Sequence, residues 1–120
     1  KMIFFKYYLD ISREEQKRRL EARHTDPLKQ WKISSLDEKA QEKWEAYSKA
    51  RDEMFVKTDF VYAPWHVVPT DEKKEARINV MQHFLSAVEY EGKDENKLLY
   101  DNDIVFPFSR EALEKGKIFP

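Results

Sequence analysis

Seven basic side chains lie within the segment 13–32, more than its acids can neutralise. They are Arg13, Lys17, Arg18, Arg19, Arg23, Lys29 and Lys32, against the acids Glu14, Glu15, Glu21 and Asp26. Residues four apart share a helix face, so Arg19 and Arg23 would present neighbouring guanidinium groups. A guanidinium binds two phosphate oxygens at once, and this pattern therefore indicates a grip on phosphate groups. Spacing alone leaves open the alternative of a charged helix face that is only solvated.

A second charged group lies at 71–74, with the sequence Asp71-Glu72-Lys73-Lys74. It directly follows a predicted strand and opens a predicted helix. Ligands of open α/β sheets gather at the carboxyl ends of the strands, so this segment could form one wall of a ligand crevice. The alternative is ordinary capping of a first helical turn by acids, with unrelated lysines beside them.

Other residue types that carry chemistry are sparse or badly spaced. The chain has no cysteine, which excludes disulfides, thiolate metal sites and thiol catalysis. Its two glycines, Gly92 and Gly116, form neither GxxxxGKS/T nor GxGxxG, so no Gly-rich phosphate loop is present. The serines lack nucleophile-elbow glycines. His24, His66 and His83 have no second histidine or carboxylate at ligand spacing, so we predict no metal site and no catalytic residue.

Nucleic-acid binding is a weaker interpretation of the same basic residues. Trp31 and Trp44 could stack on bases, and single-stranded nucleic acid binders interleave aromatic with basic residues. However, 22 Lys and Arg against 23 Asp and Glu leave a net charge of −1, whereas nucleic-acid modules are usually strongly basic. We therefore predict no nucleic-acid partner.

The elements that position the basic cluster begin with a strand at 2–11. Its aromatic and β-branched residues carry almost no charge, which is typical of a strand buried on both faces of a parallel sheet. Ser12 and Glu15 then form a capping box, in which each side chain would bond the other's backbone N–H. The helix that follows, to about His24, has only Leu20 and Ala22 as apolar residues, so core packing explains it poorly.

Helices and a second strand follow. Pro27 predicts a turn after this first helix. A long amphipathic helix is then predicted from about Ser35 to Thr58. Its apolar stripe comprises Leu36, Ala40, Trp44, Tyr47 and Met54. Residues 65–69 predict a second short strand.

The last predicted helix is capped by Thr70 or Asp71. Its apolar stripe comprises Val80, Met81, Phe84, Leu85 and Val88. Beyond Tyr90 the helical periodicity fades, although apolar clusters recur near 104–108 and 118–119. We predict a tail that packs back on the domain or on a neighbouring subunit.

Length and element order bound the fold class. The 120 residues make one domain or part of one. Strand, helix, helix, strand, helix is the back half of an alternating α/β fold, and two strands do not make a stable parallel sheet alone. We therefore expect further strands upstream. No apolar run approaches the roughly 20 residues that cross a bilayer, so we expect no membrane contact and a cytoplasmic location.

Several motifs together resemble the polyphosphate kinase 2 family, in its single-domain branch that phosphorylates nucleoside diphosphates. They are Glu14-Glu15-Gln16 with Arg19 and Arg23, the run Asp26 to Lys32, Trp44 with Tyr47, Ala50 to Val56 with Thr58-Asp59, Ala63-Pro64-Trp65, and Asp71 to Lys74 with Ala76-Arg77-Ile78-Asn79. The resemblance covers roughly residues 1–90. It divides the chain into the C-terminal half of a kinase domain at 1–90, with a lid at about 12–58, and a tail at 91–120.

The resemblance implies the C-terminal part of a P-loop kinase-like parallel sheet with a helical lid, mostly helical in this segment. It also implies phosphoryl transfer between inorganic polyphosphate and ADP or GDP, giving ATP or GTP, with Mg²⁺. Its lid residues Arg19, Arg23, Lys29 and Lys32 would bind polyphosphate. Lys73, Lys74 and Arg77 would lie near nucleotide or chain phosphates.

One departure from the family pattern concerns the Walker A loop and the acid that holds Mg²⁺, which should precede Lys1. We therefore expect the missing N-terminal half of the same protein as a partner, and no phosphoryl transfer by these 120 residues alone. A homo-oligomer is a separate expectation. The alternative function is a non-catalytic helical module whose charged helices pair with a partner protein.

Overall fold

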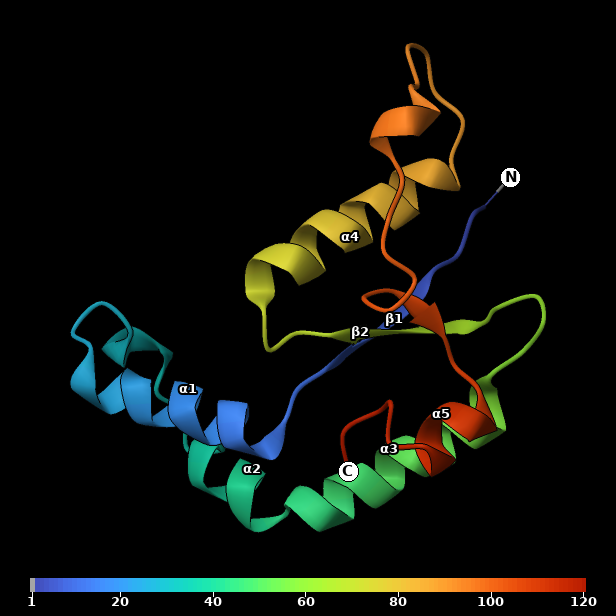
Figure 1. The fold of residues 1–120 in the computed structure, drawn as a ribbon. Coiled ribbons are helices and arrows are strands. Elements are labelled where there is room, and N and C mark those ends of the chain that lie inside the picture. The colour runs from blue at the N-terminus through green and yellow to red at the C-terminus, as the bar shows by residue number, and fades with distance from the viewer. Residues whose placement is uncertain (1) are drawn as a thin grey trace.

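A three-stranded sheet organises the chain in the computed structural model, which describes residues 2–120 (Figure 1). Lys1, the first residue of the predicted range 1–90, lies outside the described residues. Strand β1 (Lys6–Asp10) runs parallel to β2 (Trp65–Pro69), and the short strand β3 (Phe106–Pro107) pairs antiparallel with β2. The predicted α/β class is confirmed, but the sheet is mixed because the tail adds an antiparallel strand.

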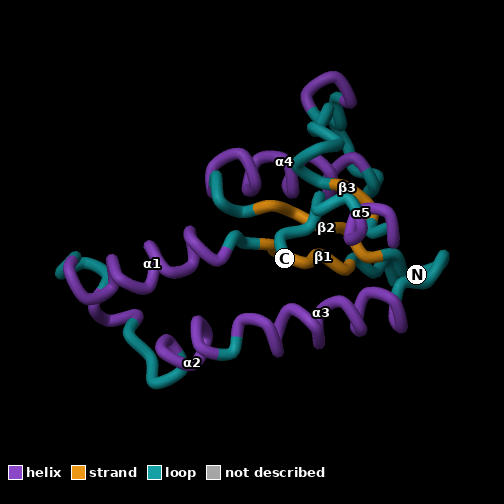
Figure 2. Tube along the Cα trace, turned by 60° about the horizontal axis from the view of Figure 1, so that its bottom comes forward, coloured by secondary structure: helices purple, strands orange, loops and turns teal. Residues whose placement is uncertain are grey.

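Helices cover both faces of this sheet. They are α1 (Arg13–Thr25), α2 (Asp37–Glu42), α3 (Trp44–Thr58), α4 (Lys73–Ser86) and α5 (Arg110–Glu114), with short 3-10 turns η1 (Gln30–Lys32) and η2 (Glu95–Lys97). Helix α4 lies on one face, while α3 and α5 lie on the other (Figure 2). Helices α1 and α2 extend beyond the end of β1. None of the helices in residues 2–120 has both the length and the apolar character needed to cross a bilayer.

The core on the α3 face joins residues that are far apart in sequence. Phe55 of α3 packs with Val67 of β2, and all side-chain atoms of both are buried. Phe106, Ala112 and Ile118 from the tail complete this cluster. The predicted packing of the tail on the domain is therefore confirmed, because strand pairing and core burial both engage it.

The predicted long helix at 35–58 is wrong in one respect, because it breaks at Lys43 (φ −98°, ψ 19°). Helix α2 turns towards α1, so the apolar stripe does not continue along one core. Leu36 and Tyr47 remain 64% and 60% exposed. The buried positions of α3 are instead Arg51 and Phe55. Trp44, predicted to be core, is half-buried and donates its indole N–H to the Pro120 oxygen at 2.8 Å.

A polar aromatic cluster occupies the α4 face. His83 is buried there, and its Nδ1 shares a hydrogen bond with the Tyr7 hydroxyl. The His66 ring lies 4.4 Å from the His83 ring, centroid to centroid, and the Tyr100 ring lies 4.9 Å from it. The spacing of the histidines in sequence gave no sign of this meeting, which depends on β2 passing beneath α4. Burial, and secondly the neighbouring His66, lower the pKa of His83 to about 4.

His83 should make stability fall in mild acid. An unfolded histidine titrates near pH 6.5, so between about pH 6.5 and 4 the unfolded chain binds a proton that folded His83 refuses. The free energy of unfolding should drop by about 3 kcal/mol over this window, in addition to losses from other groups. Urea unfolding at several pH values should show a flatter pH dependence for His83→Gln. Exposed His24→Gln is the matched control, and equal pH slopes in all three proteins would contradict the prediction.

Candidate functional site

The carboxyl edge of the parallel strands is where the two predicted basic groups meet. Strand β1 ends at Asp10 and β2 at Pro69, and these two residues are paired in register. The backbone carbonyl of Asp10 accepts hydrogen bonds from the Thr70 N–H at 2.8 Å and from the Thr70 hydroxyl at 2.7 Å. Helices α1 and α4 therefore start from one edge of the sheet (Figure 1).

Asp71 joins the start of α1 to the exit of β2. Its carboxylate accepts a hydrogen bond from the Ser12 N–H at 3.0 Å and one from the Ser12 hydroxyl at 2.6 Å. Ser12 caps α1, as predicted, by accepting the Glu15 N–H at 3.2 Å. The predicted return bond from Glu15 is wrong, because Arg18 and Arg19 take up that carboxylate and Asp71 replaces it.

The cap predicted for α4 is also corrected by these contacts. Its N-cap is Glu72, with no side-chain capping bond. Thr70 and Asp71, the residues expected to cap α4, instead bond Asp10 and Ser12 across the sheet edge. The two predicted capping side chains therefore hold α1 and β1 in place rather than α4.

Arg19 reaches from α1 to the same edge. Its Nε donates to Glu15 at 2.9 Å, and its Nη2 donates to the backbone oxygens of Thr70 at 2.6 Å and Asp71 at 3.1 Å. A guanidinium carries five N–H groups, so these contacts fix its direction without using all of its donors. The side chain retains 21% exposure and lines the cavity described below.

Arg23 points from α1 towards η1 and α2. Its Nη1 lies 2.8 Å from the carboxylate of Asp37, which is buried, and 3.1 Å from the Lys32 backbone oxygen. These contacts tie α1 to α2 and η1. Arg23 therefore holds these three elements together, and its carboxylate partner reduces the charge that it can offer a ligand.

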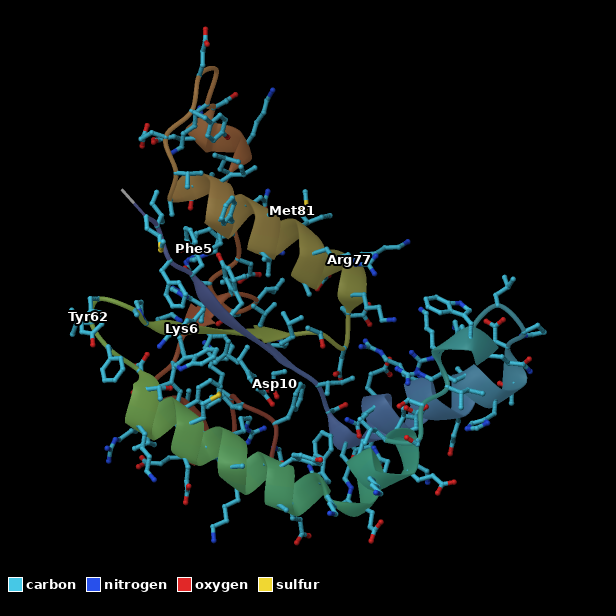
Figure 3. The ribbon with its side chains drawn as sticks, turned by 180° about the vertical axis from the view of Figure 1, so that it is seen from behind. Phe5, Lys6, Asp10, Tyr62, Arg77 and Met81 are labelled. Carbon is cyan, nitrogen blue, oxygen red and sulfur yellow. The ribbon has the colours of Figure 1, made fainter. Side chains whose placement is uncertain are left out.

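A cavity of about 440 Å³ opens beside Arg19 at the first turns of α4. Its apolar lining residues are Leu9, Ala76, Val80 and Met81, and its polar ones are Arg19, Thr70, Lys73 and Arg77. Arg77 and Met81 project from α4, with Arg77 nearer α1 (Figure 3). The cavity thus has an apolar wall and a cationic rim.

Charges from three elements act on Lys73. Its pKa is lowered first by the positive charge of Arg19, then by burial and by Lys32, Arg77 and Lys29. These cations come from α1, from the turn and η1 that follow it, and from α4. Such mutual repulsion is relieved when an anion binds among the cations, so the rim favours a ligand with several negative charges.

Three of the seven predicted site residues lie on this rim, and two more add to the positive field at Lys73. Arg19, Lys73 and Arg77 line the cavity, and Lys29 and Lys32 contribute to the field at Lys73. Arg23 is turned to Asp37, and Lys74 is exposed away from the cavity wall. Their assignment as ligand-binding residues remains a prediction. Sequence reasoning missed Leu9 and Thr70, although both flank the strand ends where such sites form.

The acidic residues of this edge do not fit a metal centre. Within residues 2–120, no three His, Asp or Glu side chains gather as metal ligands. The Asp10 carboxylate accepts the Phe119 N–H at 2.9 Å, and that of Asp71 is occupied by Ser12. We therefore assign no Mg²⁺ ligand to these residues.

Fold and site together define a class, an α/β protein whose parallel strands end at a cationic rim suited to phosphate groups. The chain belongs to the polyphosphate kinase 2 family. The family model described as Polyphosphate kinase 2 (PPK2) matches residues 1–96. The resemblance carried by the motifs between Glu14 and Asn79 is thereby confirmed, and the match extends a few residues past Tyr90.

Relatives support the same assignment over most of the chain. NDP-polyphosphate phosphotransferase 2 of Ruegeria pomeroyi is 39% identical over 113 residues, which cover 94% of this chain and 33% of that protein. GDP-polyphosphate phosphotransferase of Pseudomonas aeruginosa is 42% identical over 120 residues, covering 98% and 33% respectively. The chain thus spans about a third of the length of these curated relatives.

A solved structure matches the fold. Polyphosphate kinase 2 from Arthrobacter aurescens TC1 superposes with a TM-score of 0.67 at 35% identity, covering 92% of this chain and 37% of that one. The match includes sheet and helices together, so the α/β arrangement described above is that of a known family member.

Proposed function

We propose that this chain supplies the polyanion-binding lid and strand edge of an enzyme that transfers phosphoryl groups between inorganic polyphosphate and nucleoside diphosphates. The observation that carries the proposal is the cavity at the strand edge, which is lined by the three cations Arg19, Lys73 and Arg77. Phosphoryl transfer is catalysed mainly by positioning and by cations that neutralise charge on the phosphate oxygens. A family whose relatives are named for polyphosphate and NDP, GDP or ADP supports this substrate class.

The proposed roles follow from the geometry of each side chain. Arg19, Lys73 and Arg77 would bind phosphate oxygens at the cavity rim, because they line it. Lys29 and Lys32 would hold the next phosphates of the chain from the lid. Arg23 would act through the lid's shape, since Asp37 holds its guanidinium.

The rest of a kinase domain would complete the site. These 120 residues contain no GxxxxGKS/T loop, so we propose that the P-loop and the Mg²⁺ ligands come from the part of the domain that the chain does not span. Among described residues, β1 pairs only with β2, and Leu9 is 61% exposed on it. A further parallel strand beside β1 would cover this edge and the exposed Met81 of α4. A cytoplasmic homo-oligomer belongs to the same proposal.

Polyphosphate binding tests the proposal directly. The purified chain should bind fluorescently labelled long-chain polyphosphate, with an affinity that falls steeply as salt rises, because the contacts are ionic. Poly-glutamate of matched charge is the comparison, since it lacks tetrahedral phosphate groups. Equal affinity for both polymers, or no binding at low salt, would leave only a charged helical interaction module.

Turnover is the second measurement. The chain incubated with ADP, polyphosphate and Mg²⁺ should yield no ATP, because a P-loop is needed to hold the nucleotide phosphates. Clear ATP formation by the purified chain would contradict the proposed division of the site between this chain and the rest of the domain.

A further inference from the structure

The last residues of the chain lie between the end of β1 and helix α3 (Figures 1 and 3). Ile118 is buried in the core, and the next residue, Phe119, donates its N–H to the Asp10 carboxylate at 2.9 Å. The Phe119 oxygen accepts a hydrogen bond from Arg51 Nη1 at 2.6 Å. The Pro120 oxygen accepts one from the Trp44 indole at 2.8 Å. Ile118 thus anchors the segment in the core, and the next two residues bond a strand and a helix.

The side chains that hold this segment are themselves buried ions. Asp10 and Arg51 are 1% and 7% exposed, and their Oδ1 and Nη1 atoms lie 3.6 Å apart. Burial raises the pKa of Asp10, and the Phe119 N–H followed by Arg51 opposes that rise. A buried ion pair is costly to desolvate, so it persists only where further hydrogen bonds satisfy it. The Phe119 backbone provides such bonds to both partners.

Asp10 also connects this segment to the cationic rim. Its backbone oxygen holds Thr70, and the Thr70 oxygen in turn accepts the Arg19 guanidinium at 2.6 Å. On the other side, Arg51 and Trp44 lie on α3, the helix by which the lid returns to the sheet. The segment therefore joins α3, where the lid ends, to the carboxyl end of β1, where the lid begins.

We propose that Ile118–Pro120 form a clasp, with Asp10 and Arg51 as positioning residues, that fixes α3 to the sheet and so sets where the lid cations stand over the cavity. Core filling alone would need Ile118 but not the bonds from charged side chains to the Phe119 backbone. The expected loss of polyphosphate affinity on breaking the clasp rests on the proposed function. The expected change in the position of the lid helices does not.

Distance measurements on the chain without polyphosphate test the clasp. Because the chain has no cysteine, spin labels can be placed at Glu38→Cys on α2 and Glu75→Cys on α4, both exposed. The labelled chain without further substitutions should give one narrow distribution of label-to-label distances. Asp10→Asn and deletion of 118–120 should each at least double the width of that distribution. Lys115→Ala is the control, because Lys115 is exposed and pairs with exposed Glu111 on α5.

Folding and function are separated by two further readouts. Trp44→Phe removes only the Pro120 bond while keeping an aromatic ring, so it decides the case if the other variants unfold. It should widen the distribution by a smaller factor. Unchanged widths in folded Asp10→Asn and Trp44→Phe would overturn the clasp. Polyphosphate affinity should fall about fivefold in the same variants. If the distance distribution widens but the unsubstituted chain does not bind polyphosphate, the proposed function is refuted and the clasp is not.

Discussion

Replacing Lys73 and Arg77 together with alanine is expected to weaken polyphosphate binding about tenfold to thirtyfold at low salt. Both side chains line the cavity rim at the start of α4. Each hydrogen bond to a charged group contributes about 1 kcal/mol or more, so two lost contacts account for this factor. The repulsion that lowers the pKa of Lys73 in the free chain is relieved by the bound anion, which makes this position particularly sensitive.

The measurement is a titration of labelled polyphosphate followed by fluorescence anisotropy at two salt concentrations. The control removes the same number of positive charges elsewhere, with Lys57→Ala and Lys115→Ala, whose side chains are exposed and pair with exposed Glu53 and Glu111. The difference between the two double variants should shrink as salt rises. Equal loss of affinity in both would mean that net charge, and not the rim, binds the polymer.

Local patterns predicted the elements of this chain well where a single segment carries its own signal. The strand at 65–69 agrees with β2, and the capped helix after Ser12 agrees with α1. The strand at 2–11 was too long by several residues, since apolar residues before Lys6 continue the pattern without pairing to β2. Ends of elements depend on partners, which one segment does not reveal.

Non-local contacts set the limits of prediction. Strand β3 has two residues, and only its pairing with β2 gives it an identity. The break at Lys43 follows from the attraction of α2 to α1, through Arg23 with Asp37 and Gln16 with Gln41. No periodicity in 35–58 indicates such a contact, because its partners lie in the preceding helix.

The candidate site divides in the same way. Arg19 and Arg23 are equivalent by spacing, yet one reaches the strand edge and the other a buried carboxylate. Which of the two arginines meets a carboxylate depends on where α2 places Asp37. The rule that ligands gather at the carboxyl ends of strands pointed to the segment 71–74, of which Lys73 lines the cavity. Arg77, which also lines it, was indicated only by the family resemblance. The sequence therefore indicated which end of the strands to consider. Which of its cations line the cavity depends on the three-dimensional structure.

Truncating Phe55 to alanine should lower the free energy of unfolding by about 3–5 kcal/mol. Phe55 is fully buried, and its ring stacks on that of Phe108 with centroids 4.7 Å apart. The rings of Tyr8 and Trp65 pack edge-on against it at 5.1 and 5.8 Å. These partners come from both parallel strands and from the tail, so the cavity left by truncation has no single side that can collapse to fill it. Urea unfolding followed by circular dichroism measures the change.

Val56→Ala on the same helix is the matched control, because Val56 is 42% exposed and its truncation should cost less than about 0.5 kcal/mol. A chain with typical stability of about 5–15 kcal/mol loses much of its margin in the first variant and almost none in the second. The tail should also become protease-sensitive in Phe55→Ala, since Phe108 loses the ring on which it stacks. If the tail stayed protected and both variants were equally stable, residues beyond Tyr90 would contribute nothing to the core.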